Sequence, residues 1–300
     1  MYFLNEEERL LLYKGIIPQS RAMYIDESLR GWNWQNPPLE PIYDIRLGVF
    51  EVANNYCPNN RDLYLRRVLN ISATPNFQMI EGAILHEVIT LFITQAKREL
   101  YSIDMKDIYQ DNFLNLSEEN INKLLDYRDN VELKEKIRLL WNYEKQKVIF
   151  RLQEVLSRQP YIGIDSLIYQ VLPVVVEHKL NGTFLGLSPH LSTDAVNFSE
   201  PMIVDIKFGQ KKDFHKLSVT GYALVMEAIH SFPVNIGFLV YPVFKGNRIL
   251  VEKEFVLIDD ELRQKFIDIR DEKMRMIYQE DDPGIPDNCY QICPFYKECR

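Results

Sequence analysis

The sequence has few cysteines, glycines and prolines, and it has no long uninterrupted apolar run. Four cysteines in 300 residues are too few for a secreted fold held together by disulfides. Twelve glycines and 15 prolines are too few for a collagenous or disordered chain. No stretch reaches the roughly 18 apolar residues of a membrane span, and the first residues, MYFLNEEERL, are acidic where a signal peptide is basic. We therefore expect a cytoplasmic protein that does not contact a membrane.

An excess of positive charge is also lacking, because 35 lysines and arginines stand against 43 aspartates and glutamates, for a net charge of −8. A basic face is the usual mark of a nucleic-acid-binding protein, so this balance argues against one without excluding a local basic patch. What the chain does have is 46% hydrophobic residues over 300 positions. That is enough to bury the core of one large domain or of two modest ones.

Hydrophobic periodicity divides the chain into a helical front and a strand-rich back. The helical pattern covers 60–70, 79–99 and two helices within 117–158. Segments rich in β-branched residues predict strands at 172–180, 184–188, 202–208, 234–243 and 248–257, with helices at 216–230 and 260–279. The predicted fold class is therefore α/β, with a mixed sheet and crossover helices. We expect one composite unit, with a mainly helical part (1–160), a sheet-based core (161–280) and a C-terminal cysteine segment (281–300).

Two charged residues interrupt the apolar strand MIVDIKF at 202–208. Asp205 and Lys207 are two positions apart, so they project from the same face of an extended strand. Burying a carboxylate and an ammonium in an apolar strand costs on the order of several kcal/mol unless the two groups pair with each other or bind a ligand. A structural ion pair and a functional site explain the pattern equally well at this point.

Asp194 lies eleven residues before Asp205, and we expect it at the tip of a strand that a short turn joins to the strand of Asp205 and Lys207. Two carboxylates that converge on one point suit a hard divalent cation such as Mg²⁺ or Mn²⁺. A nearby lysine can orient a water molecule or steady negative charge on a phosphate. Taken alone, Asp194 is more simply an ordinary turn aspartate, and it gains meaning only beside Asp205 and Lys207.

Two predicted helices carry further candidates. His86 lies one turn after Gly82, and a mid-helix glycine often marks the close approach of another backbone. The imidazole could be a metal ligand, although a single helical histidine is more often part of the core or surface. Tyr222 could contact a phosphate or simply pack in the core. A short basic stretch could contact backbone phosphates or be only solvated, and it contains Lys211, Lys212 and Lys216.

The cysteines are unevenly placed, with Cys57 alone and Cys289, Cys293 and Cys299 within the last twelve residues. Four thiolates can bind an iron–sulfur cluster or a Zn²⁺ ion. Structural zinc sites usually have two pairs of ligands close in sequence, so this split favours a cluster over zinc. A third possibility is four unrelated reduced thiols. A bound cluster would tie the helix at 60–70 to the C-terminal segment.

The order of these residues resembles the RecB-type branch of the PD-(D/E)xK nucleases: a helical His86, then Asp194, then Asp205-x-Lys207, then a helix with Tyr222. With the cysteines included, the chain resembles the CRISPR-associated RecB-like iron–sulfur exonucleases, and among them the archaeal subtype called Csa-one. The positions that carry this resemblance run from Cys57 to Cys299, and residues 1–50 and 100–158 carry none of it.

The resemblance implies a restriction-endonuclease-like mixed sheet in 161–280. It implies that a Mg²⁺ or Mn²⁺ ion is held by His86, Asp194, Asp205 and the carbonyl of Ile206, that Lys207 is catalytic, and that Tyr222 is the motif tyrosine. It also implies an iron–sulfur cluster, 4Fe-4S rather than 2Fe-2S. The protein would then be a metal-dependent DNA exonuclease that trims single-stranded ends of spacer precursors. Its partners would be DNA, the CRISPR integrase subunits and other adaptation proteins.

Three departures from the family pattern are visible. Asp205 stands where the family usually has glutamate, Ser218 stands where it has a glutamine, and the C-terminal spacing is C-x3-C-x5-C where C-x2-C-x5-C is commoner. The second departure removes a substrate contact. An alternative function is therefore a catalytically weak iron–sulfur subunit that binds DNA or supports assembly of the CRISPR adaptation complex. A zinc-stabilised protein without a nuclease role is a third possibility.

Overall fold

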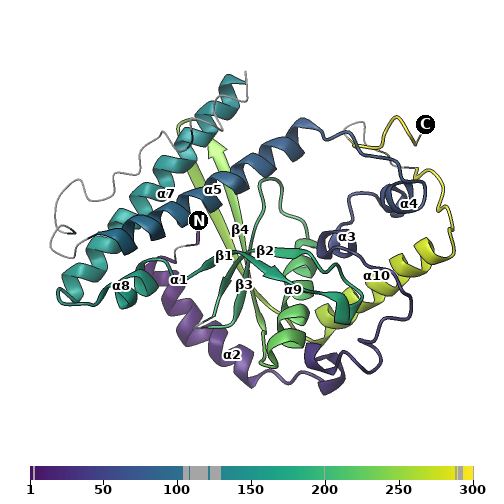
Figure 1. Cartoon of the computed structure of the whole chain (residues 1–300), viewed down its shortest axis with the longest axis horizontal. Helices are drawn as coiled ribbons and strands as arrows, with labels where there is room; N and C mark the ends of the chain where they lie inside the picture. The colour runs from purple at the N-terminus through teal and green to yellow at the C-terminus, as the bar shows by residue number, and fades with distance from the viewer. Residues whose placement is uncertain are drawn as a thin grey trace.

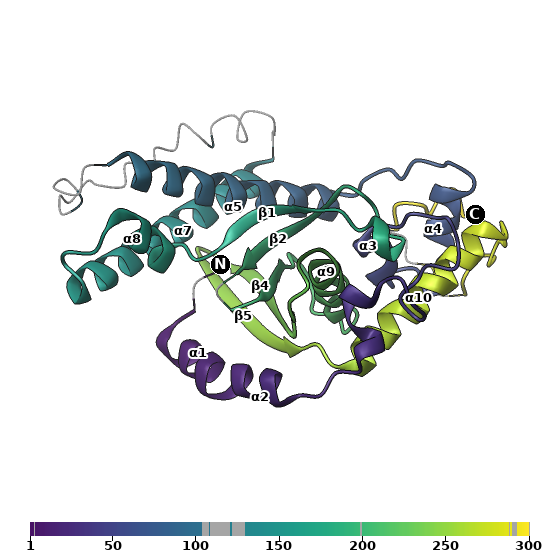
Figure 2. The same ribbon diagram turned by 60° about the horizontal axis from the view of Figure 1, so that its bottom comes forward.

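The computed structural model describes residues 1–2, 4–103, 130–198, 200–287 and 293–299, together with Ile108, Ile121 and Cys289. A five-stranded mixed sheet lies at its centre, with helices on both sides (Figures 1 and 2). The strands follow one another in space as they do in the chain: β1 (Val175–Leu180), β2 (Leu191–Asn197), β3 (Met202–Ile206), β4 (Ile236–Lys245) and β5 (Arg248–Leu257). The predicted α/β class with a mixed sheet is confirmed.

The helices agree with most of the sequence predictions. They are α1 (Glu6–Leu11), α2 (Ile17–Ala22), α3 (Val49–Ala53), α4 (Arg61–Arg67), α5 (Phe77–Ser102), α7 (Val131–Arg158), α8 (Ile164–Val171), α9 (His215–His230) and α10 (Asp260–Tyr278). A π-helical turn joins α1 to α2, and short 3-10 turns lie at Glu27–Leu29, Gly31–Asn33 and Thr183–Leu185. Of the two helices expected within 117–158, residues 131–158 form one helix, and most of the remainder lies outside the described residues.

The strand expected at 184–188 is wrong. Thr183–Leu185 forms a 3-10 turn, and Gly186 follows it with a left-handed backbone (φ 68°). A residue in that conformation ends an extended segment, which is why glycine occupies the position. The strand begins instead at Leu191, so the polar-looking segment LSTDAVN is β2.

The directions of the strands leave the carboxyl end of β3 uncovered by a tight turn. The β1–β2, β2–β3 and β4–β5 pairs are antiparallel, whereas β3 and β4 are parallel. A parallel pair needs a crossover connection, and α9 provides it. The chain therefore leaves the carboxyl end of β3 at Ile206 and passes over the sheet before it returns in β4. Residues at that end of β3 are free to form a site.

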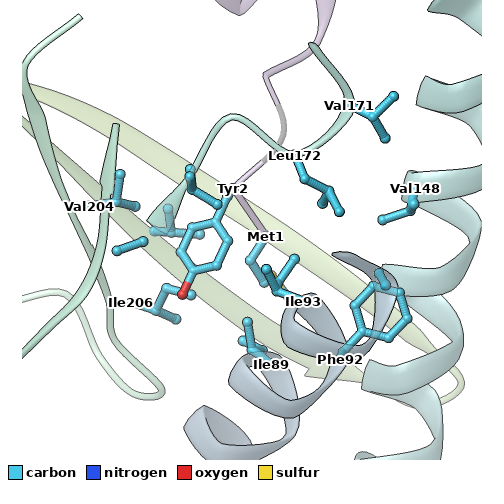
Figure 3. Close-up of a cluster of buried hydrophobic side chains, with 14 of the residues drawn as sticks. Met1, Tyr2, Ile89, Phe92, Ile93, Val148, Val171, Leu172, Val204 and Ile206 are labelled. Atoms are coloured by element: carbon cyan, nitrogen blue, oxygen red, sulfur yellow. The ribbon is translucent and has the colours of Figure 1, made fainter. Parts of the chain in front are cut away.

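The sheet separates two apolar cores. On one side α5 and α7 pack against the sheet, and Figure 3 shows the side chains of this core, including Ile89, Phe92, Ile93, Val204 and Ile206. On the other side α9 packs between the sheet and helices α3 and α10, and Ile203 and Leu239 belong to that core. Strand β3 is buried along its whole length because both of its faces are covered, which explains its near-continuous apolar sequence.

Helix α5 is long and apolar enough to cross a membrane by length and composition alone, with a mean hydropathy of 1.3 in its most apolar window. The same composition suits a core helix. Eight of its residues are buried in the first core, among them Val88, Ile89 and Phe92, each 0% exposed. The ring of Phe92 contacts that of Trp141 on α7 edge to face, with centroids 5.1 Å apart.

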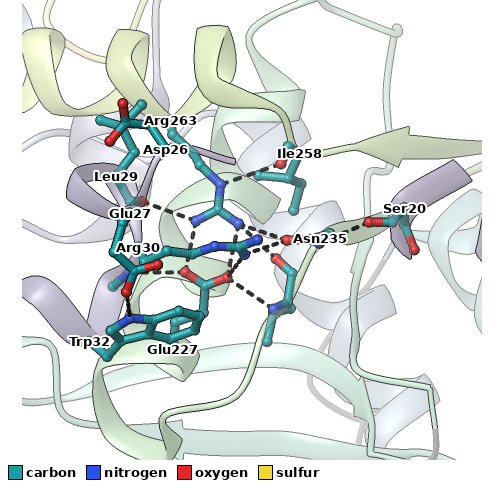
Figure 4. Close-up of polar contacts among 12 residues, drawn as sticks. Ser20, Asp26, Glu27, Leu29, Arg30, Trp32, Glu227, Asn235, Ile258 and Arg263 are labelled. Atoms are coloured by element: carbon teal, nitrogen blue, oxygen red, sulfur yellow. Dashed lines mark hydrogen bonds and ion pairs between the residues drawn. The ribbon is translucent and has the colours of Figure 1, made fainter. Parts of the chain in front are cut away.

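A buried polar network joins the segment before α3 to α9 and α10 (Figure 4). The Glu227 carboxylate is 0% exposed and accepts hydrogen bonds from Arg263 (2.7 and 2.9 Å) and Arg30 (2.9 Å). It also accepts the backbone N–H groups of Gly31 (2.9 Å) and Val234 (3.0 Å). A buried ion is tolerated only when its hydrogen bonds are satisfied in this way. The network thus fixes the position of α9, which carries part of the site described next.

Candidate active site

Asp205 and Lys207 lie at the carboxyl end of β3 on the same side of the strand, as the sequence predicts. The Lys207 Nζ is 2.8 Å from Asp205 Oδ2, and Asp205 is 5% exposed. Beyond the last residue of β3, the Lys207 N–H still donates to the Val240 carbonyl of β4 (2.9 Å). This bond extends the pairing and holds the lysine backbone beside the carboxylate.

Asp194 lies within β2 rather than in a turn, so its predicted location at a strand tip is wrong. Its Oδ2 accepts the Ile206 N–H at 2.7 Å. The pairing of Ala195 with Val204 puts Asp194 opposite Asp205, and the charge of Asp194 acts on the Asp205 carboxyl group. The strand register therefore brings together two carboxyl groups that the sequence separates by eleven positions.

His86 reaches the same place from α5. Its Nδ1 is 3.6 Å from Asp194 Oδ1, and its ring is hydrogen bonded to the backbone of Ile206. The ring of Phe208 packs edge-on against the imidazole, with centroids 5.1 Å apart. Gly82 does not mark a close backbone approach, so that prediction is wrong: among the described residues, no atom lies within 4 Å of where its Cβ would be.

Burial and mutual charge set the protonation of the site. Burial raises the pKa of Asp205 to about 6, while Lys207 opposes the rise and Asp194 adds to it. Burial lowers the pKa of His86 to about 4. Burial alone would lower the pKa of Lys207, but the charge of Asp205 outweighs it and raises that pKa. At neutral pH the site therefore contains a charged lysine and a neutral imidazole beside two carboxyl groups.

Tyr222 lies on α9 and is partly buried against the second core. Burial raises the pKa of its hydroxyl, and the charges of Asp205 and Asp194 add to the rise. The hydroxyl therefore keeps its proton at neutral pH and is available as a hydrogen-bond donor. Ser218 lies one helical turn earlier and is 5% exposed, so it shares the same stripe of the helix.

Carboxylates of β5 neutralise much of the basic stretch around the start of α9. Lys211 lies 3.1 Å from Glu252 and 3.0 Å from Glu254, and Lys216 lies 3.4 Å from Glu254. Lys212 donates its backbone N–H to His215 Nδ1 at 3.4 Å. Two of the three candidate phosphate contacts are thus engaged with carboxylates.

Four residues that the sequence reasoning did not single out surround these groups. The Tyr2 hydroxyl donates to the Asp194 carbonyl at 3.4 Å. His215 is 3% exposed, and burial lowers its pKa to about 4, with Lys207 contributing. Tyr56 and Glu177 also interact electrostatically with the site. No spacing pattern points to them, because each comes from a different element brought in by the fold.

The donor set suits a divalent cation in chemistry, although it is not preassembled. In the described part of the chain, no three side chains among His, Cys, Asp and Glu are arranged as a ready metal-binding group. His86, Asp194, Asp205 and the backbone of Ile206 instead contact one another. Within the described residues, the buried Asp205 Oδ2 has no hydrogen-bond partner, and its contact is the 2.8 Å ion pair with Lys207. Carboxylate oxygens and an imidazole nitrogen are donors that Mn²⁺ accepts, so the residues fit such an ion.

The C-terminal segment lies beside α4 in both views (Figures 1 and 2). Phe295 and Cys299 pack against Leu65, and Arg61 pairs with Asp282 at 3.0 Å. All four cysteines are free thiols. Burial raises the pKa of Cys293. Burial also raises the pKa of Cys299. Cys293 and Cys299 thus lie in the small apolar cluster around Leu65 and Phe295, and among the described residues no three cysteines are arranged to hold a metal ion.

Comparison with known proteins gives a consistent result over the full length. Residues 1–300 match the family described as "CRISPR-associated exonuclease Csa1". A protein of that name from Saccharolobus solfataricus is 31% identical over 306 residues, covering 99% of this chain and 99% of its own. Another of that name, from Thermoproteus tenax, is 27% identical over 290 residues, covering 97% and 96%. A solved structure, "Crystal structure of SSO0001", covers 54% of this chain and 79% of its own at 15% identity, and its TM-score of 0.28 is too low to bear on the fold.

Proposed function

Because the chain belongs to the CRISPR-associated exonuclease Csa1 family, we propose that it is a metal-dependent DNA exonuclease. The observation that carries this proposal is the contact of Lys207, Asp205, Asp194 and His86 at the open end of β3. One buried and one partly buried carboxyl group, a neutral imidazole and a charged lysine are groups that serve phosphodiester hydrolysis with a divalent ion.

The ion would be held by His86, Asp194, Asp205 and the carbonyl of Ile206. When bound, a Mg²⁺ or Mn²⁺ ion supplies Lewis acidity, which polarises a phosphate oxygen and lowers the pKa of water. Burial raises the pKa of Asp205 to about 6 and the neighbouring Asp194 adds to the rise, and a bound cation would relieve the cost of ionising both carboxyl groups. The neutral His86 has a nitrogen lone pair to offer because burial lowers its pKa to about 4.

The remaining side chains bind and orient the substrate. In the hydrolysis, water attacks phosphorus, the bond to the leaving oxygen breaks, and that oxygen takes up a proton. The Lys207 ammonium steadies the negative charge that develops on the phosphate. The Ile206 N–H holds Asp194 in place by its 2.7 Å bond. The protonated Tyr222 hydroxyl donates a hydrogen bond to a phosphate oxygen or the substrate backbone.

The finer details of the proposal follow the family resemblance. The substrate would be single-stranded DNA ends of spacer precursors, and the partners would be the CRISPR integrase subunits and other adaptation proteins in the cytoplasm. Cys57, Cys289, Cys293 and Cys299 would hold an iron–sulfur cluster, 4Fe-4S rather than 2Fe-2S. The packing of Phe295 and Cys299 on Leu65 supports this role, because a cluster there would join α4 to the C-terminal segment.

The proposal is tested with the full chain purified without oxygen. Single- and double-stranded DNA labelled at either end is incubated with Mg²⁺ or Mn²⁺, for the wild type, Asp205→Asn and Lys207→Ala. Lys265→Ala on the exposed face of α10 is the matched control. We expect metal-dependent shortening that falls at least about a hundredfold in both site variants and not in the control, the range of losses seen for electrostatic contacts to a transition state. Equal shortening by all four proteins would contradict this active site.

A second candidate function is a weakly catalytic subunit that binds DNA or supports assembly. It is favoured by Ser218 at the position of the motif glutamine and by the pairing of Lys211 and Lys216 with β5 carboxylates. The same assay separates the two. If wild type and site variants are equally inert while all of them bind DNA, the assembly function is the better account.

A further inference from the structure

A row of aromatic rings leads from the candidate active site to the surface. It begins at Tyr241 of β4, which is buried. Ile206 pairs with Val240 in the parallel register of β3 and β4, so Lys207 and Tyr241 are the next residues in that register. The Lys207 N–H donates to the Val240 carbonyl at 2.9 Å, which continues the pairing past the end of β3. The row therefore begins beside the lysine of the site.

Each ring of the row contacts the next one. The Tyr241 hydroxyl lies 3.2 Å from His215 Nδ1, and the two rings stack with centroids 5.7 Å apart. The His215 and Phe214 rings meet edge to face at 4.9 Å, and those of Phe214 and Tyr56 do so at 5.0 Å. Aromatic rings attract each other at these separations and angles. The row thus holds Tyr56, from the loop between α3 and α4, against the start of α9.

Tyr56 is the residue at which the row reaches solvent. It is 54% exposed, whereas Tyr241 and His215 are 2% and 3% exposed. Its backbone N–H donates to Asn54 Oδ1 at 2.9 Å, so the turn that presents the ring does not depend on the Tyr56 side chain. Burial raises the pKa of the Tyr56 hydroxyl and the charge of Lys207 opposes the rise, so the ring and the ammonium act on each other. An exposed ring supported by other rings beside a cationic group is suited to stacking on a base.

Two ammonium groups accompany the row of rings. Lys207 lies at its inner end, and Lys212 donates its backbone N–H to His215 Nδ1 at 3.4 Å. Lys211 and Lys216 pair with carboxylates of β5, whereas the exposed Lys212 makes no ion pair with any residue that the structure describes. Rings accompanied by positive charges match a ligand that combines flat bases with phosphates, and single-stranded nucleic acid is such a ligand.

We propose that Tyr56 stacks on a nucleobase of a DNA strand whose phosphate lies at Lys207. This inference rests on the proposed function, and it identifies the side chain that holds the strand beside the site. Phe214 supports the Tyr56 ring, and Lys212 contacts a neighbouring phosphate. Every base has a π face, so the stack accepts any sequence. It favours an unpaired strand, because the bases of a duplex already stack on one another.

The test measures binding of a fluorescein-labelled single-stranded oligonucleotide by anisotropy, with chelator present and with the full chain purified without oxygen. Tyr56→Ala removes the ring, whereas Tyr56→Phe and Tyr56→Trp keep one. Tyr161→Ala removes a tyrosine that is 99% exposed in the turn after α7, and it is the matched control. We expect the Kd to rise at least about fivefold in Tyr56→Ala, the lower end of the range for losing one base–aromatic stack. The other three variants should bind within about twofold of the wild type.

A second oligonucleotide, of the same length but without bases, separates stacking from a general loss of structure. The wild type should bind the strand with bases more tightly than the abasic strand. Tyr56→Ala should lose this preference and bind the abasic strand as the wild type does. A variant weakened equally on both strands would contradict stacking by Tyr56.

The outcomes separate this inference from the function it rests on. If the wild type and Tyr56→Ala bind the strand with bases within about twofold of each other, Tyr56 has no role and the proposed nuclease still stands. Weak binding by Tyr56→Phe and Tyr56→Trp would also overturn the stacking role, because both keep an aromatic ring. A wild type that binds neither strand would overturn the DNA substrate and the role of Tyr56 together.

Discussion

Asp205 makes the stability of the metal-free protein depend on pH in a defined direction. Burial raises the pKa of this carboxyl from 3.8 to about 6. An acid with a raised pKa in the folded state holds its proton more tightly there than in the unfolded chain. Its contribution to stability is therefore fully present at low pH and is lost as pH rises from 3.8 through 6. A shift of roughly 2 units corresponds to about 3 kcal/mol.

The variant Asp205→Asn isolates this contribution, because asparagine has nearly the same shape and does not titrate. We expect the free energy of unfolding of the wild type, relative to the variant, to fall by about 2 kcal/mol between pH 4 and pH 7, most of the full change of about 3 kcal/mol. Urea unfolding followed by circular dichroism, with chelator present, measures both proteins. His86 titrates in the opposite direction, since burial lowers its pKa to about 4, and the comparison largely cancels it because both proteins contain it.

Asp268→Asn, on an exposed part of α10, is the control and should differ from the wild type by the same amount at every pH. The reasoning is refuted if the difference between wild type and Asp205→Asn is flat from pH 4 to pH 7. A difference that grows in favour of the wild type with rising pH would also refute it, because that would mean that Lys207 outweighs burial.

Three further predictions concern stability. Glu227→Gln removes the charge that offsets two buried guanidinium groups and should lower the free energy of unfolding in urea by about 3–5 kcal/mol. The control Glu261→Gln should leave that free energy almost unchanged, and a loss under about 1 kcal/mol for Glu227→Gln would contradict the stabilising role of the network. Gly31→Ala places a Cβ 2.0 Å from the Leu224 carbonyl oxygen and should lower stability by about 1–3 kcal/mol, and an unchanged Tm would show that the contact relaxes freely. Cys293→Ala should lose both the colour and the solubility of the protein, and a soluble, stable, colourless variant would contradict a structural cluster.

Much of the fold could be predicted from the sequence where one element carries its own pattern. The apolar spacing of α5 and the β-branched runs of β3, β4 and β5 identify those elements without tertiary information. Strand β2 was missed because LSTDAVN is polar in composition and is buried only by what packs around it. The segment 184–188 looked like a strand because its composition does not show that Gly186 takes a left-handed backbone.

The candidate site could likewise be predicted only where the residues are close in the sequence. Asp205 and Lys207 could be paired from their spacing alone, since two positions on a strand share a face. The contact of Asp194 with Asp205 depends on the register between β2 and β3, which spacing does not reveal. The neutralisation of Lys211 needs Glu252, 41 positions later. Long-range pairing is thus the part that the sequence left open.

The most direct test of the central claim is metal-dependent trimming by the site at the end of β3. Single-stranded DNA labelled at one end is incubated with the wild type and with Asp194→Asn, each with Mn²⁺ or with chelator. The account predicts progressive shortening by the wild type with Mn²⁺, none with chelator, and none by Asp194→Asn under either condition. Shortening by Asp194→Asn at the wild-type rate, with Mn²⁺ present, would contradict it.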